Sequence, residues 1–253
     1  MLRSLRLPPR TVNPPEPAGG YPALLMLISI VSLLALVVWA GATGRSLSPV
    51  TWYVARASGL ALYLLLWLTV VLGMGIISGL FGRFGGRGLM TSVHAFVTRL
   101  SYAFLALHML SLVIDQTLPF GLRQMVVPFS STWHEPWTGF GVISAWLFIL
   151  VGGSFAARRL IGFRAWRVLH ALALPLYGIA LLHGIGSGSD ASVLWVQLTY
   201  AATAGTVFFL LIYRLFQGNH RQRSAMPKPR RPTDRLLKTA HTGDGSAHAH
   251  LDH

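Results

Sequence analysis

The chain contains no cysteine among its 253 residues, and only 11% of its residues are charged, with 7 acidic residues in all. Without cysteine it cannot form disulfides, thiolate-ligated haem, iron–sulfur clusters or cysteine zinc sites. Histidine is then the only strong metal-ligating residue type inside its apolar segments. The scarcity of charge, with 53% hydrophobic residues and a mean hydropathy of +0.55, is also far from the average of soluble proteins. The composition therefore predicts a protein whose solvent is a lipid bilayer.

Six apolar runs follow one another along the chain, and each is close to the length of about 20 residues that a helix needs to cross a bilayer. They cover residues 21–40, 58–80, 92–114, 140–157, 166–184 and 194–216. We expect an all-α fold, a polytopic bundle of six transmembrane helices within residues 21–216. A polar lead-in at 1–20 and a disordered, basic, histidine-containing tail at 217–253 are expected to flank it.

The basic residues lie at the ends of these runs, where they determine the orientation of the helices. When the runs alternate in direction, only Arg45, Arg56 and Arg123 fall on one side, which leaves 18 of the 21 Lys and Arg residues on the other. Both termini are therefore expected in the cytoplasm, and the connection at 115–139 on the outer side. The formal charge of +14 then reflects membrane topology, and no nucleic-acid partner is expected.

Four histidines lie inside two of the runs at matching depths. His94 and His108 are 14 positions apart in the third run, and His170 and His183 are 13 positions apart in the fifth. At about 1.5 Å per residue each separation is roughly 20 Å, so each helix offers one imidazole near each membrane face. His94 and His170, nearer the cytoplasm, form one natural pair. His108 and His183, nearer the outer face, form the other, and the two pairs are suited to hold the irons of two haems.

The second spacing does not fit an ideal helix. Fourteen residues return to within about 40° of the starting direction, whereas thirteen miss it by about 140°. Pro175 lies between His170 and His183, and a proline can kink the helix and change its winding there. We therefore expect a local correction near Pro175.

A simpler interpretation is that each histidine only bonds a hydroxyl or a backbone carbonyl of a neighbouring helix. Four histidines that match in spacing, depth and direction favour haem ligation. Two imidazoles on each iron leave no open coordination position, which favours electron transfer over the binding of small gases.

The chain resembles a known family at these residues. The histidine pairs in the third and fifth runs, with the sequences RASG at 56–59 and WRVLH at 166–170, resemble the ferric reductase-like transmembrane domain over about residues 50–216. That family includes the membrane cores of NADPH oxidases and ferric reductases and a stand-alone bacterial haem-binding membrane subunit. The resemblance implies a diheme b-type cytochrome with two haem b groups in the plasma (inner) membrane of a bacterium. Its implied role is to pass electrons from the cytoplasmic side to an outer-side acceptor.

The fused members of that family continue into a flavin and nicotinamide domain. The 37 residues at 217–253 are too few for one, because domains usually need at least about 50 residues. We therefore expect an oxidoreductase component that needs a separate electron donor, either a cytoplasmic flavoprotein or a membrane quinol. A bound flavin or quinone is an additional candidate cofactor.

Three arginines are candidates to pair with the anionic haem propionates, because a guanidinium group is a planar fork suited to carboxylates. Arg56, at the outer end of the second run, is expected near the outer haem. Arg99 and Arg167, which are close in sequence to the inner histidines, are expected near the inner haem. The alternative for these two is snorkelling to the membrane interface. An unpaired arginine within the membrane costs about 2.5–3.5 kcal/mol on insertion scales.

Two other classes of function remain open. A membrane transporter or permease for metal or protons would be lined by the histidines, bind no haem and carry an ion flux. A non-catalytic anchor would recruit a soluble partner through residues 217–253, and deletion of that tail would abolish its function.

Overall fold

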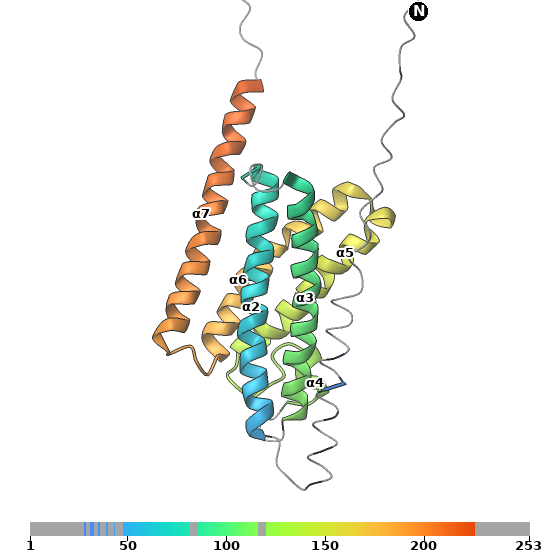
Figure 1. Ribbon diagram of the computed structural model, residues 1–253, viewed down its shortest axis with the longest axis vertical. Coiled ribbons are helices and arrows are strands. Elements are labelled where there is room, and N and C mark those ends of the chain that lie inside the picture. Colours follow the sequence, from blue (N-terminus) through green and yellow to red (C-terminus); the bar gives the residue numbers. More distant parts are fainter. Residues whose placement is uncertain are drawn as a thin grey trace, which may run out of the picture. The chain divides into compact units, whose positions relative to one another are not determined.

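The computed structural model describes residues 48–80, 86–115 and 120–225, with the backbone alone at 217–225, and a few isolated positions between 28 and 43. All secondary-structure elements in these ranges are helices (Figure 1). They are α2 (Ser48–Ser78), α3 (Gly86–Ile114), α4 (Leu122–Val126), α5 (Trp137–Ala171), α6 (Ala173–Ser187) and α7 (Leu194–Ala225). The expected lead-in at 1–20 and most of the first expected span lie outside the described residues, as does the tail beyond 225.

Four stretches in the described part of the chain are long and apolar enough to cross a membrane. They are Pro49–Ser78, Gly86–Ile114, Trp137–Ser187 and Leu194–Phe216. The third and sixth expected spans each fall within one of these stretches, and the second does so except for residues 79–80. The fourth and fifth fall together within Trp137–Ser187. The all-helical, membrane-spanning character that the composition predicts is thus present. Helix α7 itself continues to Ala225, through polar residues that the sequence analysis assigned to the tail.

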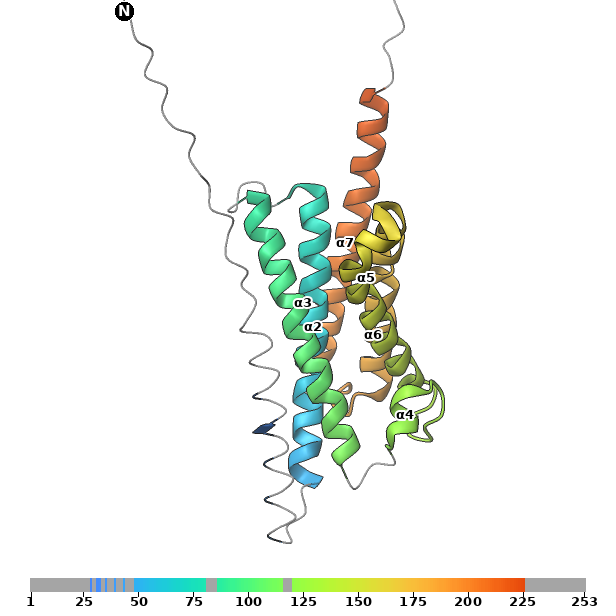
Figure 2. The ribbon, with the colours of Figure 1, turned by 90° about the vertical axis from the view of Figure 1, so that its right-hand side faces the viewer.

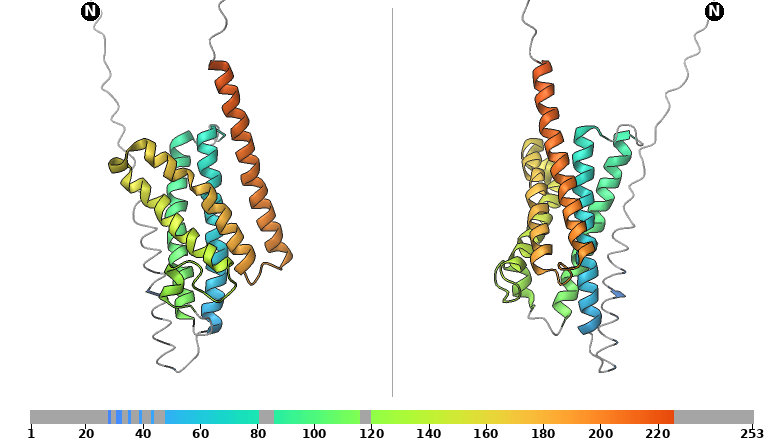
Figure 3. Two further views of the ribbon diagram at one scale, coloured as in Figure 1. Left: turned by 180° about the vertical axis from the view of Figure 1, so that it is seen from behind. Right: turned by 90° about the vertical axis from the view of Figure 1, so that its left-hand side faces the viewer.

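The stretch Trp137–Ser187 reverses direction at Gly162, where φ is 80° and ψ is 160°. Trp137 lies against Gly186 at the two ends of the stretch, so the legs 137–161 and 163–187 run antiparallel. Figures 2 and 3 show the first leg rising and the second leg returning beside it. The stretch is 51 residues long, which suits two membrane crossings better than one.

Helix α2 packs along α3, helix α5 packs along α6, and α2 also contacts α6. Their shared core contains a set of buried apolar side chains from α2, α5, α6 and α7. These are Tyr63, Leu66, Val70, Met74, Phe148, Leu176, Tyr177, Val207 and Leu210. The chain divides into two units between Leu211 and Ile212, and the four histidines lie in the first.

The two ends of the first unit differ in charge. One end, here called the basic end, holds the end of α2, the start of α3 and the turn at Gly162. Its described basic residues are Arg87, Arg158, Arg159, Arg164 and Arg167. The opposite end, here called the loop end, holds α4 and the α6–α7 connection. All acidic residues in the described ranges lie there, namely Asp115, Glu135 and Asp190.

Replacing Gly162 with alanine should destabilise this unit by about 1–3 kcal/mol, because its φ of 80° and ψ of 160° belong to a region that only glycine adopts without strain. A Cβ at Gly162 would meet no atom within 4 Å, so the effect comes from the backbone alone. Gly153→Ala is the control, since Gly153 is in the same helix, also has free space and has no positive φ. Denaturation in detergent measures both, and equal stabilities would contradict the prediction.

Candidate functional site

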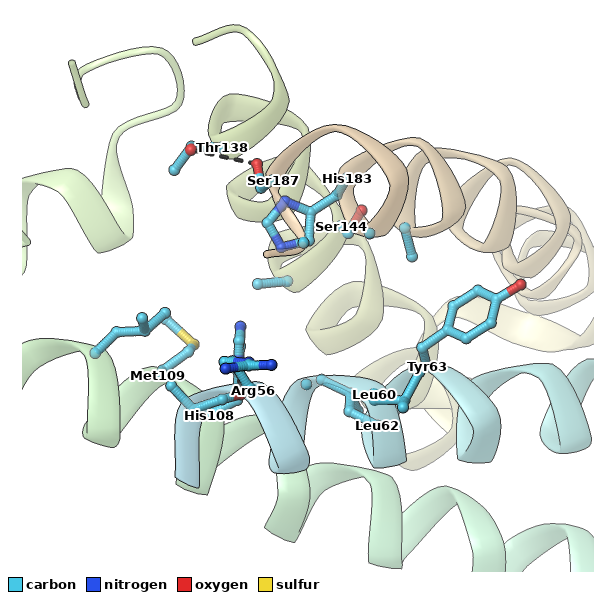
Figure 4. Close-up of a pocket in the computed structure, with 18 of the residues that line it drawn as sticks. Arg56, Leu60, Leu62, Tyr63, His108, Met109, Thr138, Ser144, His183 and Ser187 are labelled. Atoms are coloured by element: carbon cyan, nitrogen blue, oxygen red, sulfur yellow. Dashed lines mark hydrogen bonds between the residues drawn. The ribbon is translucent and has the colours of Figure 1, made fainter. Parts of the chain in front are cut away.

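The structure brings the four histidines together as two pairs. The ring centres of His94 and His170 are 6.2 Å apart, with the ring planes at 71°. His108 and His183 face one cavity of about 230 Å³ from opposite sides (Figure 4). The structure therefore shows the pairing that the helix directions predict. In the part of the chain that it describes, no cluster of three or more potential metal ligands occurs.

Three of the histidines are held by a backbone carbonyl of the neighbouring helix. Nδ1 of His94 is 3.1 Å from the carbonyl oxygen of Thr69. Nδ1 of His108 is 2.8 Å from that of Ala55, and Nδ1 of His183 is 3.0 Å from that of Trp137. Because a carbonyl can only accept, each Nδ1 is the protonated nitrogen that donates. Nε2 of each ring is then left as the lone-pair nitrogen, which is the form that ligates a metal.

Each of these three rings also lies against a glycine. A Cβ on Gly59 would come 2.9 Å from Cε1 of His108, and one on Gly141 would come 2.6 Å from Cε1 of His183. At Gly73 the corresponding distance to Cε1 of His94 is 3.4 Å. Any larger side chain at Gly59 or Gly141 would therefore displace the imidazole.

His170 is held differently. Among the described residues, neither its buried Nδ1 nor the buried Nε1 of Trp166 has a hydrogen-bond partner. The two rings stack with centres 5.2 Å apart and an angle of 28°. Phe163 also packs on Trp166, with 5.3 Å between the ring centres, and Phe163 is 63% exposed. A continuous row of aromatic rings thus leads from the surface of the basic end to the His94–His170 pair.

The correction expected near Pro175 occurs three residues before it. Helix α5 ends at Ala171, and the amide of Leu172 bonds the carbonyl of Leu169, a tighter winding than that of an α-helix. Proline has no amide hydrogen to bond the carbonyl of Ala171, which explains a break at this position. The altered winding lets His170 and His183 both face the bundle despite their spacing.

The cavity at the loop end is bordered by charge. Arg56 lines it and binds Asp190 of the α6–α7 connection through both Nε and Nη2. Nε is 2.9 Å from Oδ2 of Asp190, and both side chains are about one-third exposed. Sequence reasoning placed Arg56 at the outer site but missed Asp190, because no local motif links two residues that are 134 positions apart.

The other two candidate arginines lie on the surface. Arg99 is exposed on α3, and Arg167 is exposed at the basic end with its guanidinium 5.0 Å from the ring centre of Phe163. The described residues form no ion pair with either. Their exposed positions fit the snorkelling alternative, and their pairing with haem propionates stays a prediction.

Aromatic side chains fill the layer between the two pairs. Tyr63 and Tyr177 stack at 5.9 Å between ring centres, and their hydroxyls are 2.9 Å apart. The hydroxyl of Tyr63 also bonds that of Thr203 at 2.5 Å. Tyr102 packs on Phe148 at 4.4 Å between ring centres. The sequence indicated these residues only as apolar positions within spans, so their clustering at mid-depth was missed.

Comparisons with protein-family models, with curated proteins and with solved structures find no match to this chain.

The change Tyr63→Phe should lower the free energy of unfolding by about 1–3 kcal/mol, because it leaves the buried hydroxyl of Tyr177 without its partner. Tyr63→Phe/Tyr177→Phe removes both hydroxyls of that bond and should be less destabilising than the sum of the single changes. Tyr53→Phe, at a ring that is 65% exposed, is the control and should have little effect. Denaturation of the four variants measures this, and strict additivity would refute the coupling.

Proposed function

We propose that the chain is a diheme b-type cytochrome of the ferric reductase-like kind, which carries electrons across a membrane to an outer-side acceptor. The observation that carries the proposal is the pairing of four half-buried histidines at two depths of an apolar bundle, His94 with His170 and His108 with His183. The resemblance noted in the sequence points the same way.

The residues present fit two bis-histidine haems. Two metal–imidazole bonds of about 2 Å, extended to the ring centres, give a separation of roughly 6 Å. The ring centres of His94 and His170 are 6.2 Å apart. His108 and His183 border a largely apolar cavity, with Arg56 at its loop-end margin to meet an anionic group. The hydrogen bonds of His94, His108 and His183 use Nδ1 and leave Nε2 available for iron.

Bound haem supplies one-electron redox chemistry, and the chain supplies position and surroundings. His94 with His170 would hold one iron and His108 with His183 the other, and two imidazole ligands on each iron would leave no site for an exogenous ligand. The layer that contains Tyr63, Tyr177 and Tyr102 separates the two pairs with packed rings, so there is a continuous protein medium between them.

The proposed topology has six spans and both termini in the cytoplasm, in the plasma (inner) membrane of a bacterium. The concentration of arginine at the basic end supports this orientation, because basic residues are enriched on the cytoplasmic side. The His94–His170 pair is then the inner one. The His108–His183 pair and its cavity lie toward the outer side, where the acceptor is met.

We place electron entry at the turn around Gly162. Phe163 and Trp166 connect its surface to His170, and arginines surround it on both legs. No acidic residue lies at this end in the described ranges. A separate cytoplasmic flavoprotein with an acidic face would be attracted to this surface. A membrane quinol remains the other donor class.

The alternative of a histidine-lined transporter or permease for metal or protons has less support. A permeation route needs an open path through the layer between the pairs. Between the two histidine pairs the core is tightly packed, and Leu66 and Leu176 are 6% and 1% exposed.

Alanine at any one of the four histidines should reduce the haem content from about two per chain to about one, because a bis-histidine site loses half of its protein ligands. His94→Ala and His170→Ala should lose the same haem, and His108→Ala and His183→Ala the other. His134→Ala, at an exposed residue of the loop end, is the control. Haem assay and difference spectra measure this, and full haem content in all four variants would contradict the proposal.

Arg164→Glu/Arg167→Glu should slow reduction of the haems by reduced flavodoxin, an acidic flavoprotein used as the probe, by about tenfold or more at low salt. Reduction by free reduced flavin, which needs no docking surface, should change little. Arg123→Glu reverses an exposed arginine at the loop end and is the control. Stopped-flow absorbance measures the rates. If both reversals behave alike, electron entry is not at the Gly162 turn.

A further inference from the structure

The three histidines with a carbonyl partner share one arrangement. In each case the accepting carbonyl belongs to a residue four positions before the glycine that the ring touches. The pairs are Ala55 and Gly59 for His108, Thr69 and Gly73 for His94, and Trp137 and Gly141 for His183. The same spacing recurs for Tyr102, whose hydroxyl donates to the carbonyl of Phe148 at 3.0 Å and lies against Gly152.

Helix geometry explains the spacing. The carbonyl of residue i accepts the amide of residue i+4, but it has a second lone pair. The Cα–Cβ bond at i+4 tilts toward the helix N-terminus, so a side chain there covers the carbonyl of residue i. Glycine at i+4 uncovers that carbonyl for a donor from the neighbouring helix. The close distances at Gly59 and Gly141 show that the ring occupies the space of the missing Cβ.

We infer that Gly59, Gly73 and Gly141 are positioning residues, each of which opens one backbone carbonyl to the Nδ1 of a haem-ligating histidine and thereby sets the redox potential of that haem. The inference rests on the proposed diheme function. It goes beyond that function because it assigns a role in redox tuning to three glycines, which have no side chain to contact the cofactor.

The direction of the effect follows from the hydrogen bond. A carbonyl that accepts from Nδ1 raises the basicity of the imidazole and strengthens its donation to iron. Stronger donation favours the ferric state, so the bond lowers the reduction potential. Loss of the bond raises it. No carbonyl in the described ranges accepts from His170, so the glycine pattern assigns two tuning bonds to the His108–His183 haem and one to the His94–His170 haem.

The test is a redox titration of the purified holoprotein, with the two haems resolved by difference spectra. The variants are Gly59→Ala, Gly141→Ala and Gly73→Ala. Gly178→Ala and Gly205→Ala are matched controls, because a Cβ at either helical position would meet nothing within 4 Å. Haem content per chain is measured on the same samples, so a variant that loses a haem still gives a result.

Gly59→Ala and Gly141→Ala should raise the midpoint potential of the same single haem, or weaken its binding by about 10–100-fold, and leave the other haem unchanged. Gly73→Ala should affect the other haem and do so less, because its Cβ distance of 3.4 Å is the longest of the three. Both controls should keep both midpoints.

The inference would be overturned if Gly59→Ala or Gly141→Ala lowered the midpoint potential of its haem. It would also be overturned if both variants behaved like the controls, or if they changed both haems equally. Failure of the proposed function is a separate outcome, because it appears as a wild-type protein without two haems. If the wild-type protein binds two haems but Gly59→Ala and Gly141→Ala leave both midpoint potentials unchanged, only the role of the glycines is refuted.

Discussion

An imidazole inside an apolar helix bundle needs a partner for its N–H group, and helical carbonyls are the most abundant acceptors there. This constraint organises the site. His94, His108 and His183 each donate Nδ1 to a carbonyl of the adjacent helix, and a glycine one turn further on makes that approach possible. The bonds fix the tautomer and leave Nε2 as the nitrogen with a free lone pair. Close packing of α2 on α3, and of the two legs of Trp137–Ser187 on each other, is therefore a condition for the pairs to form.

The distribution of charge gives the bundle a direction. Arginines gather at the basic end around the Gly162 turn, and the described acidic residues lie at the loop end, where Asp190 binds Arg56. Between these ends the rings of Phe163, Trp166, His170 and His94 make contact in sequence, and the tyrosine layer follows them. In the proposed function this is the order from donor to acceptor. The polar groups of the middle layer bond one another, which lets Tyr63 and Tyr177 lie in an apolar core without unsatisfied hydroxyls.

Hydropathy predicted the helical, membrane-spanning character and the approximate limits of the described spans, because burial in lipid constrains every residue of a span. Helix geometry also predicted which histidines pair. It predicted the correction near Pro175, since proline removes a known hydrogen bond, although the break lies at Leu172. Long-range partners could not be predicted. The link from Arg56 to Asp190 and the contact of each glycine with a histidine ring depend on which faces of different helices meet, and one sequence does not specify that.

The most direct test of the account is the low-temperature electron paramagnetic resonance spectrum of the oxidised, detergent-purified protein, with haem counted per chain. About two haems per chain are expected, both low-spin with two imidazole ligands, because each histidine pair would supply both protein ligands of one iron. A protein that carries no haem when expressed with adequate haem supply, or haem that is high-spin with an open position, would contradict it.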